Sequence, residues 1–411
     1  MNVIIVGAGI GGLTAALTLK AQGYNPIVYE AVPEIRPLGV GINLLPHSVR
    51  VLSNLGLQES LLMQGVATRE LVYFNKHGQR IWDESRGRDA GYPWPQISLG
   101  RGALQQALLA ETIARLGPTG VRSGHRLIDF DNTGTDVTAH FSMGSGSEVA
   151  TATGDILIAA DGIHSAVRQI LYPHEEPPIY AGRVLWRATT RAPPFLTGAS
   201  MIMAGHQDQK FVAYPISRAD RNGHQTINWI AELRREKALN REDWNRGGNL
   251  EEFLPAFAGW RFNWLDIPAL MRGADAIYEF PLVDRNPLPK WTFGRVTLLG
   301  DAAHAMYPIG SNGASQAIVD ADSLGRALVD HADPREALLA YQDERLPPTS
   351  AIVLANRQNG PEQCMQLAEE RAPDGFDRIE SVIAAHELEA IAARYKSVAG
   401  FSRADVEAAA R

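Results

Sequence analysis

The first third of the chain alternates short apolar runs with helical patterns. Residues 3–6 form an apolar, β-branched run that is typical of a strand buried on both faces. Residues 13–22 follow with apolar positions at helical spacing, and Gly23 stands where a helix would end. Residues 27–29 predict a second strand that ends at Glu30. A strand, a helix and a strand in this order predict a βαβ unit with parallel strands.

The same strand pattern returns twice, at residues 155–160 and 296–299, and helices are expected at 47–55 and 101–116. Between about 179 and 276 the pattern changes to alternating apolar positions with tryptophans, which predicts an inserted antiparallel sheet. The tail from about residue 335 is mainly helical, and Pro347-Pro348 is expected to break it.

Composition removes several classes of protein. The chain has 411 residues, of which 45% are hydrophobic and 21% charged, as in a soluble globular enzyme of two or three domains. The net charge of −7 argues against non-specific binding of nucleic acid. One cysteine, Cys364, excludes an internal disulfide, a catalytic dithiol and a cysteine-rich metal site, and we predict no metal. Because no basic leader and no run of ~20 apolar residues is found, we predict a cytoplasmic protein without a membrane partner.

A GxGxxG motif joins the first strand to the first helix. Gly7 permits the tight turn, Gly9 lets the backbone approach a pyrophosphate, and Gly12 lets the helix pack against the strand. Glu30 lies 18 residues after Gly12, where a carboxylate accepts hydrogen bonds from ribose hydroxyls and disfavours a ribose 2′-phosphate. These residues predict a bound dinucleotide, FAD or NAD rather than NADP.

Further candidate segments follow predicted strands. Residues 161–168 come after the second strand of this type, and residues 300–314 after the third. Open α/β sheets bind ligands at the carboxyl ends of their strands, so these loops are expected to converge. Arg36 and Arg101 are candidates for phosphate or ribose contacts, although each also fits an ordinary surface or turn position.

Three motifs together resemble the FAD-dependent aromatic-ring monooxygenases of the para-hydroxybenzoate hydroxylase fold (group A). They are the glycine motif with Glu30, Asp161-Gly162 with Arg168, and Gly300-Asp301 with the loop that begins at Pro308. They cover the chain from residue 1 to about 330. Four stretches, at 35–43, 244–246, 283–289 and 298–316, are similar to the phenazine-carboxylate monooxygenases of that family.

The resemblance implies an α/β fold with a Rossmann-like domain of the glutathione-reductase type that binds FAD. This discontinuous domain is expected at 1–70, 98–177 and 277–345, with a mainly antiparallel substrate-binding sheet domain at 71–97 and 178–276 and a C-terminal helical segment at 346–411. The family uses NADH or NADPH as a transient co-substrate. With dioxygen it hydroxylates an aromatic or heteroaromatic ring, in some members with decarboxylation, through a flavin hydroperoxide.

The resemblance also assigns site residues. The predicted contacts of FAD are Gly7, Gly9, Ile10, Gly11, Gly12, Glu30, Ala31, Arg36, Val40, Gly41, Arg101, Leu127, Asp161, Gly162, Asp301, Pro308, Gly310, Asn312, Gly313 and Ala314. The predicted substrate contacts are Trp186, Tyr214, Trp229 and Pro308 as walls, and Arg187 and Lys210 as partners of a carboxylate. No catalytic acid, base or nucleophile is assigned, because the flavin carries the chemistry. His304 and His164 are interpreted as packing histidines, and Ser165 as a helix cap.

Several alternatives stay open. The chain could act on hydroxybenzoates, on salicylate or on urate. It could also be a non-catalytic binding protein with the flavin fold, whereas the motifs at Asp301 and Pro308 disfavour a NAD dehydrogenase. We expect a monomer or a homodimer, since the C-terminal helices suit either a dimer contact or a solvated face.

Overall fold

The computed structural model describes residues 1–37, 39–144, 148–236 and 247–408. Leu38 and the stretch 244–246, which contributed to the resemblance, lie outside the described residues, as do the last three residues of the predicted C-terminal segment.

The predicted parallel strands lie side by side in one six-stranded sheet. Its order is β20 (Thr292–Phe293), β21 (Val296–Leu298), β12 (Ile156–Ala159), β1 (Asn2–Val6), β2 (Asn25–Tyr29) and β8 (Val121–Arg122), and only β20 is antiparallel to its neighbour. All four residues of β12 are buried, as expected for a strand covered on both faces. This order places the loops that follow β1, β12 and β21 next to one another.

Helices cover one face of this sheet. The first, α1 (Ile10–Ala21), packs against α4 (Arg101–Leu116) and α8 (Gly313–Asp330). Residues 12–19 of α1 are all buried, which its small and apolar side chains permit. The remaining helices of this region are α2 (Pro46–Asn54), α3 (Gln58–Gln64), α5 (Ala166–Leu171) and α7 (Asp301–His304).

Two small antiparallel sheets flank the parallel one. The first is formed by β9 (His125–Asn132), β10 (Val137–Met143) and β11 (Glu148–Gly154), and the second by β3 (Gly41–Leu44), β7 (Gln96–Gly100) and β4 (Val66–Thr68). Strand β7 of the second sheet contacts both α4 and the inserted sheet.

The inserted sheet has seven strands and is mainly antiparallel, as predicted. Its order is β19 (Ala274–Asp284), β13 (Ile179–Ala192), β16 (Gln225–Arg234), β15 (Gln209–Pro215), β14 (Ser200–His206), β5 (Glu70–Phe74) and β6 (Arg80–Ser85), and β14 pairs with β5 in parallel. Strand β19 continues to Asp284, eight residues past the expected boundary at 276. One face of this sheet is covered by η2 (Leu250–Glu252), η3 (Leu254–Phe257) and α6 (Ile267–Arg272), beside the short hairpin of β17 (Arg261–Phe262) and β18 (Leu265–Asp266).

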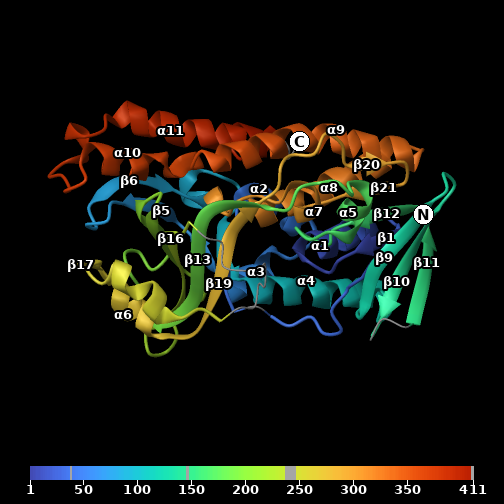
Figure 1. The fold of residues 1–411 in the computed structure, drawn as a ribbon, viewed down its shortest axis with the longest axis horizontal. Coiled ribbons are helices and arrows are strands. Elements are labelled where there is room, and N and C mark those ends of the chain that lie inside the picture. The colour runs from blue at the N-terminus through green and yellow to red at the C-terminus, as the bar shows by residue number, and fades with distance from the viewer. Residues whose placement is uncertain (38, 145–147, 237–246, 409–411) are drawn as a thin grey trace.

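The C-terminal helices lie along one long side of the molecule, over both large sheets (Figure 1). They are α9 (Pro334–Arg357), α10 (Gln363–Arg371), α11 (Ala385–Val398) and α12 (Arg403–Ala408). The expected break at Pro347-Pro348 is wrong, because α9 runs through both prolines. The carbonyls that would bond to the two missing N–H groups belong to Asp343 and Glu344, which are exposed, so water can satisfy them.

Side chains of the C-terminal helices pack against the rest of the chain. Cys364 and Met365 of α10 join an apolar cluster with Leu71 and Met203, and Tyr395 and Phe401 join another with Leu45. These buried contacts fix the segment to both parts of the molecule. Within the described residues, no helix is long and apolar enough to cross a membrane.

Candidate functional site

The glycine turn between β1 and α1 is shaped as the motif predicts. Gly7 has a φ of +102°, and a Cβ there would lie 2.4 Å from the carbonyl oxygen of Ala160. A Cβ on Gly12 would lie 2.0 Å from the carbonyl oxygen of Gly7. A Cβ on Gly9 would meet no atom within 4 Å. The turn therefore packs tightly on its inner side and is open at Gly9, which fits a pyrophosphate.

Glu30 ends β2 beside this turn. One carboxylate oxygen accepts a hydrogen bond from the N–H of Ala8 (2.8 Å), and the other accepts one from the N–H of Val32 (2.9 Å). The carboxylate thus holds the glycine turn and the loop after β2 in place. Its remaining lone pairs can accept hydrogen bonds from ribose hydroxyls.

Asp161 and Gly162 follow β12. The Oδ2 atom of Asp161 accepts a hydrogen bond from the N–H of Ala166 (2.8 Å), whereas its buried Oδ1 has no partner among the described residues. Burial raises the pKa of this carboxyl in spite of its hydrogen bonds. A buried oxygen of this kind leaves room for a donor from a bound molecule. Ser165 caps α5 by accepting from the N–H of Arg168 (3.0 Å), which confirms its predicted role.

Arg168 joins two of the motifs. Its guanidinium donates to the carbonyl oxygens of Ala302 (3.0 Å) and Ala303 (3.1 Å) in α7 and forms an ion pair with Glu175. Arg285 reaches the same glutamate at 3.1 Å. Because Arg168 is 1% exposed, it fixes the loop after β12 to the helix after β21 and is not available to a ligand.

Asp301 and His304 are the first and last residues of α7 and differ in burial. Asp301 is exposed at the start of the helix, whereas His304 is buried with Nε2 2.6 Å from Asp320. Asp320 also accepts from Arg345 (2.8 Å) and from the N–H of Gly300 (3.1 Å). Burial by itself would raise the pKa of Asp320. His304 and Arg345 together have the larger effect and lower this pKa to about 2. His304 is therefore a packing histidine, as interpreted from the sequence.

The loop from Pro308 to Ala314 is held by a residue that the sequence analysis missed. Gly310 and Ser311 have φ angles of +66° and +59°, and the buried Asn312 donates to the hydroxyl of Tyr395 (2.8 Å). The same hydroxyl lies 3.1 Å from the carbonyl oxygen of Ile309. Tyr395 belongs to α11 and is 83 residues away from Asn312, so no local pattern pointed to it. Gly313 and Ala314 begin α8 and are half-buried, and Pro308 is exposed.

Three further predicted FAD contacts lie together. The N–H of Arg101, the exposed first residue of α4, donates to the carbonyl of Val40 (2.8 Å). The N–H of Gly41 donates to Asn228 (2.6 Å), and its carbonyl accepts from Arg187 (2.8 Å).

The other predicted FAD contacts are more scattered. Arg36 lies apart in an exposed ion pair with Glu34. Leu127 is buried in the apolar core. The half-buried Ile10 and Gly11 begin α1 beside the glycine turn, and the half-buried Ala31 follows Glu30.

For two residues, the prediction that they form a wall of the substrate site is wrong. Trp186 and Trp229 are fully buried on the outer face of the seven-stranded sheet, where both pack against Phe253. Alternation along β13 and β16 turns their neighbours, Arg187 and Asn228, to the inner face. Tyr214 is also on the inner face, where burial raises its pKa to about 12 against the influence of Arg187.

Lys210 is not available to a substrate carboxylate. Its Nζ lies 2.6 Å from Glu362 and 2.9 Å from Glu232, and the residue is 4% exposed. The two carboxylates of the protein occupy the positions that a substrate carboxylate would need. The sequence could not show this, because Glu362 is 152 residues away.

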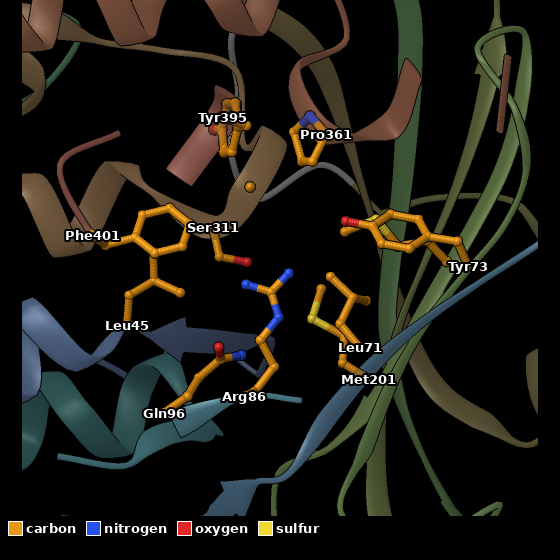
Figure 2. Close-up of a pocket in the computed structure, with 12 residues that line it drawn as sticks. Leu45, Leu71, Tyr73, Arg86, Gln96, Met201, Ser311, Pro361, Tyr395 and Phe401 are labelled. Carbon is orange, nitrogen blue, oxygen red and sulfur yellow. The ribbon is translucent and has the colours of Figure 1, made fainter. Parts of the chain in front are cut away.

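A small cavity lies on the inner face of the sheet, next to Gly310 and Ser311 (Figure 2). Most of its wall is apolar or aromatic. Those residues are Leu45, Leu71, Met201, Met203, Pro361 and Phe401. The polar part consists of Tyr73, Arg86, Gln96 and Tyr395, together with Ser311. None of these residues was predicted as a substrate contact, since they come from separate segments of the chain.

Comparison with known proteins agrees with this site. Residues 1–355 match the family model described as "FAD binding domain". The chain is 47% identical over 362 residues to the phenazine 1,6-dicarboxylic acid hydroxylase PhzS of Lysobacter antibioticus, covering 87% of this chain and 89% of that protein. It is 30% identical to the 6-hydroxynicotinate 3-monooxygenase of Pseudomonas fluorescens, over 80% of this chain and 82% of that one.

A solved structure agrees as well. A single-residue variant of HpxO from Klebsiella pneumoniae, complexed with FAD, superposes with a TM-score of 0.72 at 25% identity, over 97% of this chain and 94% of that one. The fold, the glycine turn and the converging loops are those of an FAD protein, and the predicted fold class is confirmed. The chain therefore belongs to the FAD-dependent aromatic-ring monooxygenases of group A.

Proposed function

We propose that this monooxygenase acts on a fused-ring aromatic carboxylate of the phenazine type, with NADH or NADPH as the reductant. The observation that carries the proposal is the 47% identity, over most of both chains, to a phenazine 1,6-dicarboxylic acid hydroxylase. The cavity beside Gly310 supports it. Its apolar and aromatic wall suits a flat ring.

A bound FAD would supply the redox chemistry of the reaction, namely acceptance of a hydride from the nicotinamide and activation of dioxygen for oxygen transfer to the ring. The chain's own residues bind the cofactor and orient the substrate. The glycine turn and Glu30 are placed to hold the pyrophosphate and the ribose, and the loop from Pro308 to Ala314 borders the cavity. The amino-terminal end of α8 lies at this loop, where its positive dipole stabilises negative charge.

Exclusion of water is the second task of the chain. Leu45, Met201 and Phe401 enclose the cavity beside Ser311, and Tyr395 holds the loop in contact with the C-terminal segment. A dry cavity keeps the activated oxygen from being lost as hydrogen peroxide before it reaches the ring. No side chain of the protein is needed as a catalytic acid or base in this scheme.

A second candidate is a single-ring substrate of the hydroxybenzoate or hydroxynicotinate type. It is favoured by the 30% identity to a 6-hydroxynicotinate 3-monooxygenase and by a similar identity to a 3-hydroxybenzoate 6-hydroxylase of Aquipseudomonas alcaligenes.

The test is substrate-stimulated oxidation of NADH and of NADPH by the FAD-loaded protein. Phenazine-1,6-dicarboxylate, phenazine-1-carboxylate, 3-hydroxybenzoate and 6-hydroxynicotinate are compared, and product mass separates hydroxylation from formation of hydrogen peroxide and reveals decarboxylation. We expect coupled turnover with a phenazine carboxylate. Coupled turnover with the single rings alone would replace the first proposal by the second.

The division into domains, a cytoplasmic location and a monomeric or dimeric state remain proposals. Support for the first comes from the two sheets, whose strands follow the predicted segments except for the end of β19 and for Glu70 at the start of β5. Sedimentation of the purified protein distinguishes a monomer from a dimer.

A further inference from the structure

One wall of the cavity carries a positive charge that faces the enclosed space. Arg86 follows β6, and its guanidinium extends to the middle of the cavity towards Ser311 (Figure 2). Its Nε is buried and has no hydrogen-bond partner in the part of the chain that the structure describes. Among the described residues that line the cavity, Arg86 is the only charged one.

The surroundings of Arg86 do not neutralise it. Glu84 is the nearest carboxylate, 3.7 Å from the guanidinium, but it lies closer to Lys396, at 2.5 Å. Burial alone would raise the pKa of Glu84, whereas Arg86 and Lys396 lower it below its usual value, so the carboxylate is ionised. Arg86 and Lys396 therefore share one carboxylate. A buried charge of this kind is stabilised by an anionic partner.

Two more polar groups face the same space. The hydroxyl of Tyr73 points into the cavity from the side opposite Phe401, and it is buried without a partner among the described residues (Figure 2). Burial raises its pKa well above the usual value, so the hydroxyl keeps its proton and can donate. The Oε1 of Gln96 is likewise buried without a partner in the described part of the chain. Rotation of that amide by half a turn would present its NH₂ donors instead.

We propose that Arg86, with Tyr73 and Gln96, binds a carboxylate group of the ring substrate and so makes the enzyme selective for aromatic carboxylates. The inference rests on the proposed function, and it identifies the part of the cavity that recognises the substrate. Guanidinium and carboxylate form paired, charge-assisted hydrogen bonds, and the donors of Tyr73 and Gln96 can satisfy the remaining lone pairs. The ring then lies against the apolar wall with one edge towards Gly310 and Ser311.

The experiment measures binding to the oxidised holoenzyme, without reductant, from the change in flavin absorbance. Phenazine-1-carboxylate is compared with phenazine, which lacks the charge. We expect the acid to bind about 10- to 100-fold more tightly than the neutral ring. Arg86→Met should bind both with similar affinity, and Arg86→Lys should keep part of the preference. Arg88→Met is the matched control, because Arg88 is exposed two residues further along and should leave the preference unchanged.

Flavin content and melting temperature show whether each variant folds. If Arg86→Met fails to fold, Gln96→Leu and Arg86→Lys decide, and each should lower the preference at least threefold. A preference that survives in the folded Arg86→Met variant, or that is undiminished in both of the others, overturns the inference and leaves the proposed function standing. If neither phenazine binds to the native protein, the proposed substrate class is wrong. The anion site is then tested by comparing the binding of benzoate with that of neutral benzamide. If benzoate does not bind, or binds no more tightly than benzamide, the inference is overturned.

Discussion

Single residues of the glycine turn differ in what they do for the protein. Gly12 is needed by the fold itself, because a Cβ there would collide with the backbone of Gly7 at 2.0 Å. Gly9 is not needed by the fold, since a Cβ there would meet nothing within 4 Å and its φ of −74° suits any residue. Its lack of a side chain has a reason only if a ligand lies against it.

This difference predicts opposite behaviour of two variants. Gly9→Ala should leave the melting temperature of the FAD-free protein within about 2 °C of the native value, since surface substitutions are usually within ~0.5 kcal/mol. It should weaken FAD binding at least tenfold, measured by fluorescence titration. Gly12→Ala should destabilise the FAD-free protein by more than about 2 kcal/mol. Tight binding of FAD by a folded Gly9→Ala protein would contradict the assignment of the turn to the pyrophosphate.

At the scale of elements, a buried charge network joins three helices below the loop after β21. Asp320 of α8 accepts hydrogen bonds from His304 of α7 and Arg345 of α9, and from the N–H of Gly300. The carboxylate is completely buried, so it is stable only while these partners are in place. The network therefore positions α7 and the start of the adjoining loop without touching a reacting atom.

The network predicts a pH dependence of stability. The pKa of Asp320 is about 2 in the folded protein, below its usual value of 3.8. A lowered folded-state pKa stabilises the protein above the unfolded-state pKa, and this stabilisation is lost as the pH falls through the folded-state pKa. A shift of this size corresponds to about 2 kcal/mol. The difference in unfolding free energy between the native protein and Asp320→Asn should therefore shrink by most of that amount as the pH falls from about 5 to about 2. A constant difference in urea titrations would show that the carboxylate is not stabilised as described.

At the scale of the whole molecule, the C-terminal segment is an integral part of the region around the cavity. Tyr395 and Phe401 line the cavity, and Tyr395 holds the loop at Ile309. The buried ion pairs of Lys210 join β15 and β16 to η5 (Gly360–Glu362). The segment therefore closes the cavity and ties the inserted sheet to the helices that cover the nucleotide-binding region.

Removal of the Lys210 cation at this junction should destabilise the folded protein. Lys210→Met leaves Glu232 and Glu362 buried without their common partner, so we expect a loss of about 3–5 kcal/mol in unfolding free energy. The matched variant Lys210→Met/Glu232→Gln/Glu362→Gln, which has no buried charge left in the triad, should recover much of the loss. Denaturant titration of both proteins provides the measurement. If Lys210→Met instead kept its stability and raised only the KM for a carboxylate, Lys210 would bind substrate after all.

The sequence by itself determined the parts of this protein that rest on local patterns. The strands around β1 and β12, the glycine turn and the cap at Ser165 each depend on neighbouring residues, so hydrophobic spacing and turn chemistry were enough to predict them. The tertiary structure decided what depends on distant contacts. Alternation showed that the inserted sheet has two faces, but only packing showed that Trp186 faces the outer helices and that Arg187 faces inwards.

The cavity could not be predicted from the sequence for the same reason. Arg86, Tyr73 and Tyr395 have no common motif, and they meet only because β5, β6 and α11 fold against one loop. Lys210 appeared free to bind a ligand until Glu362 was found beside it. Local physics therefore predicted the backbone turn that we assign to FAD, because such a turn is a local structure. The cavity is formed by side chains from separate segments, and only their three-dimensional packing defines it.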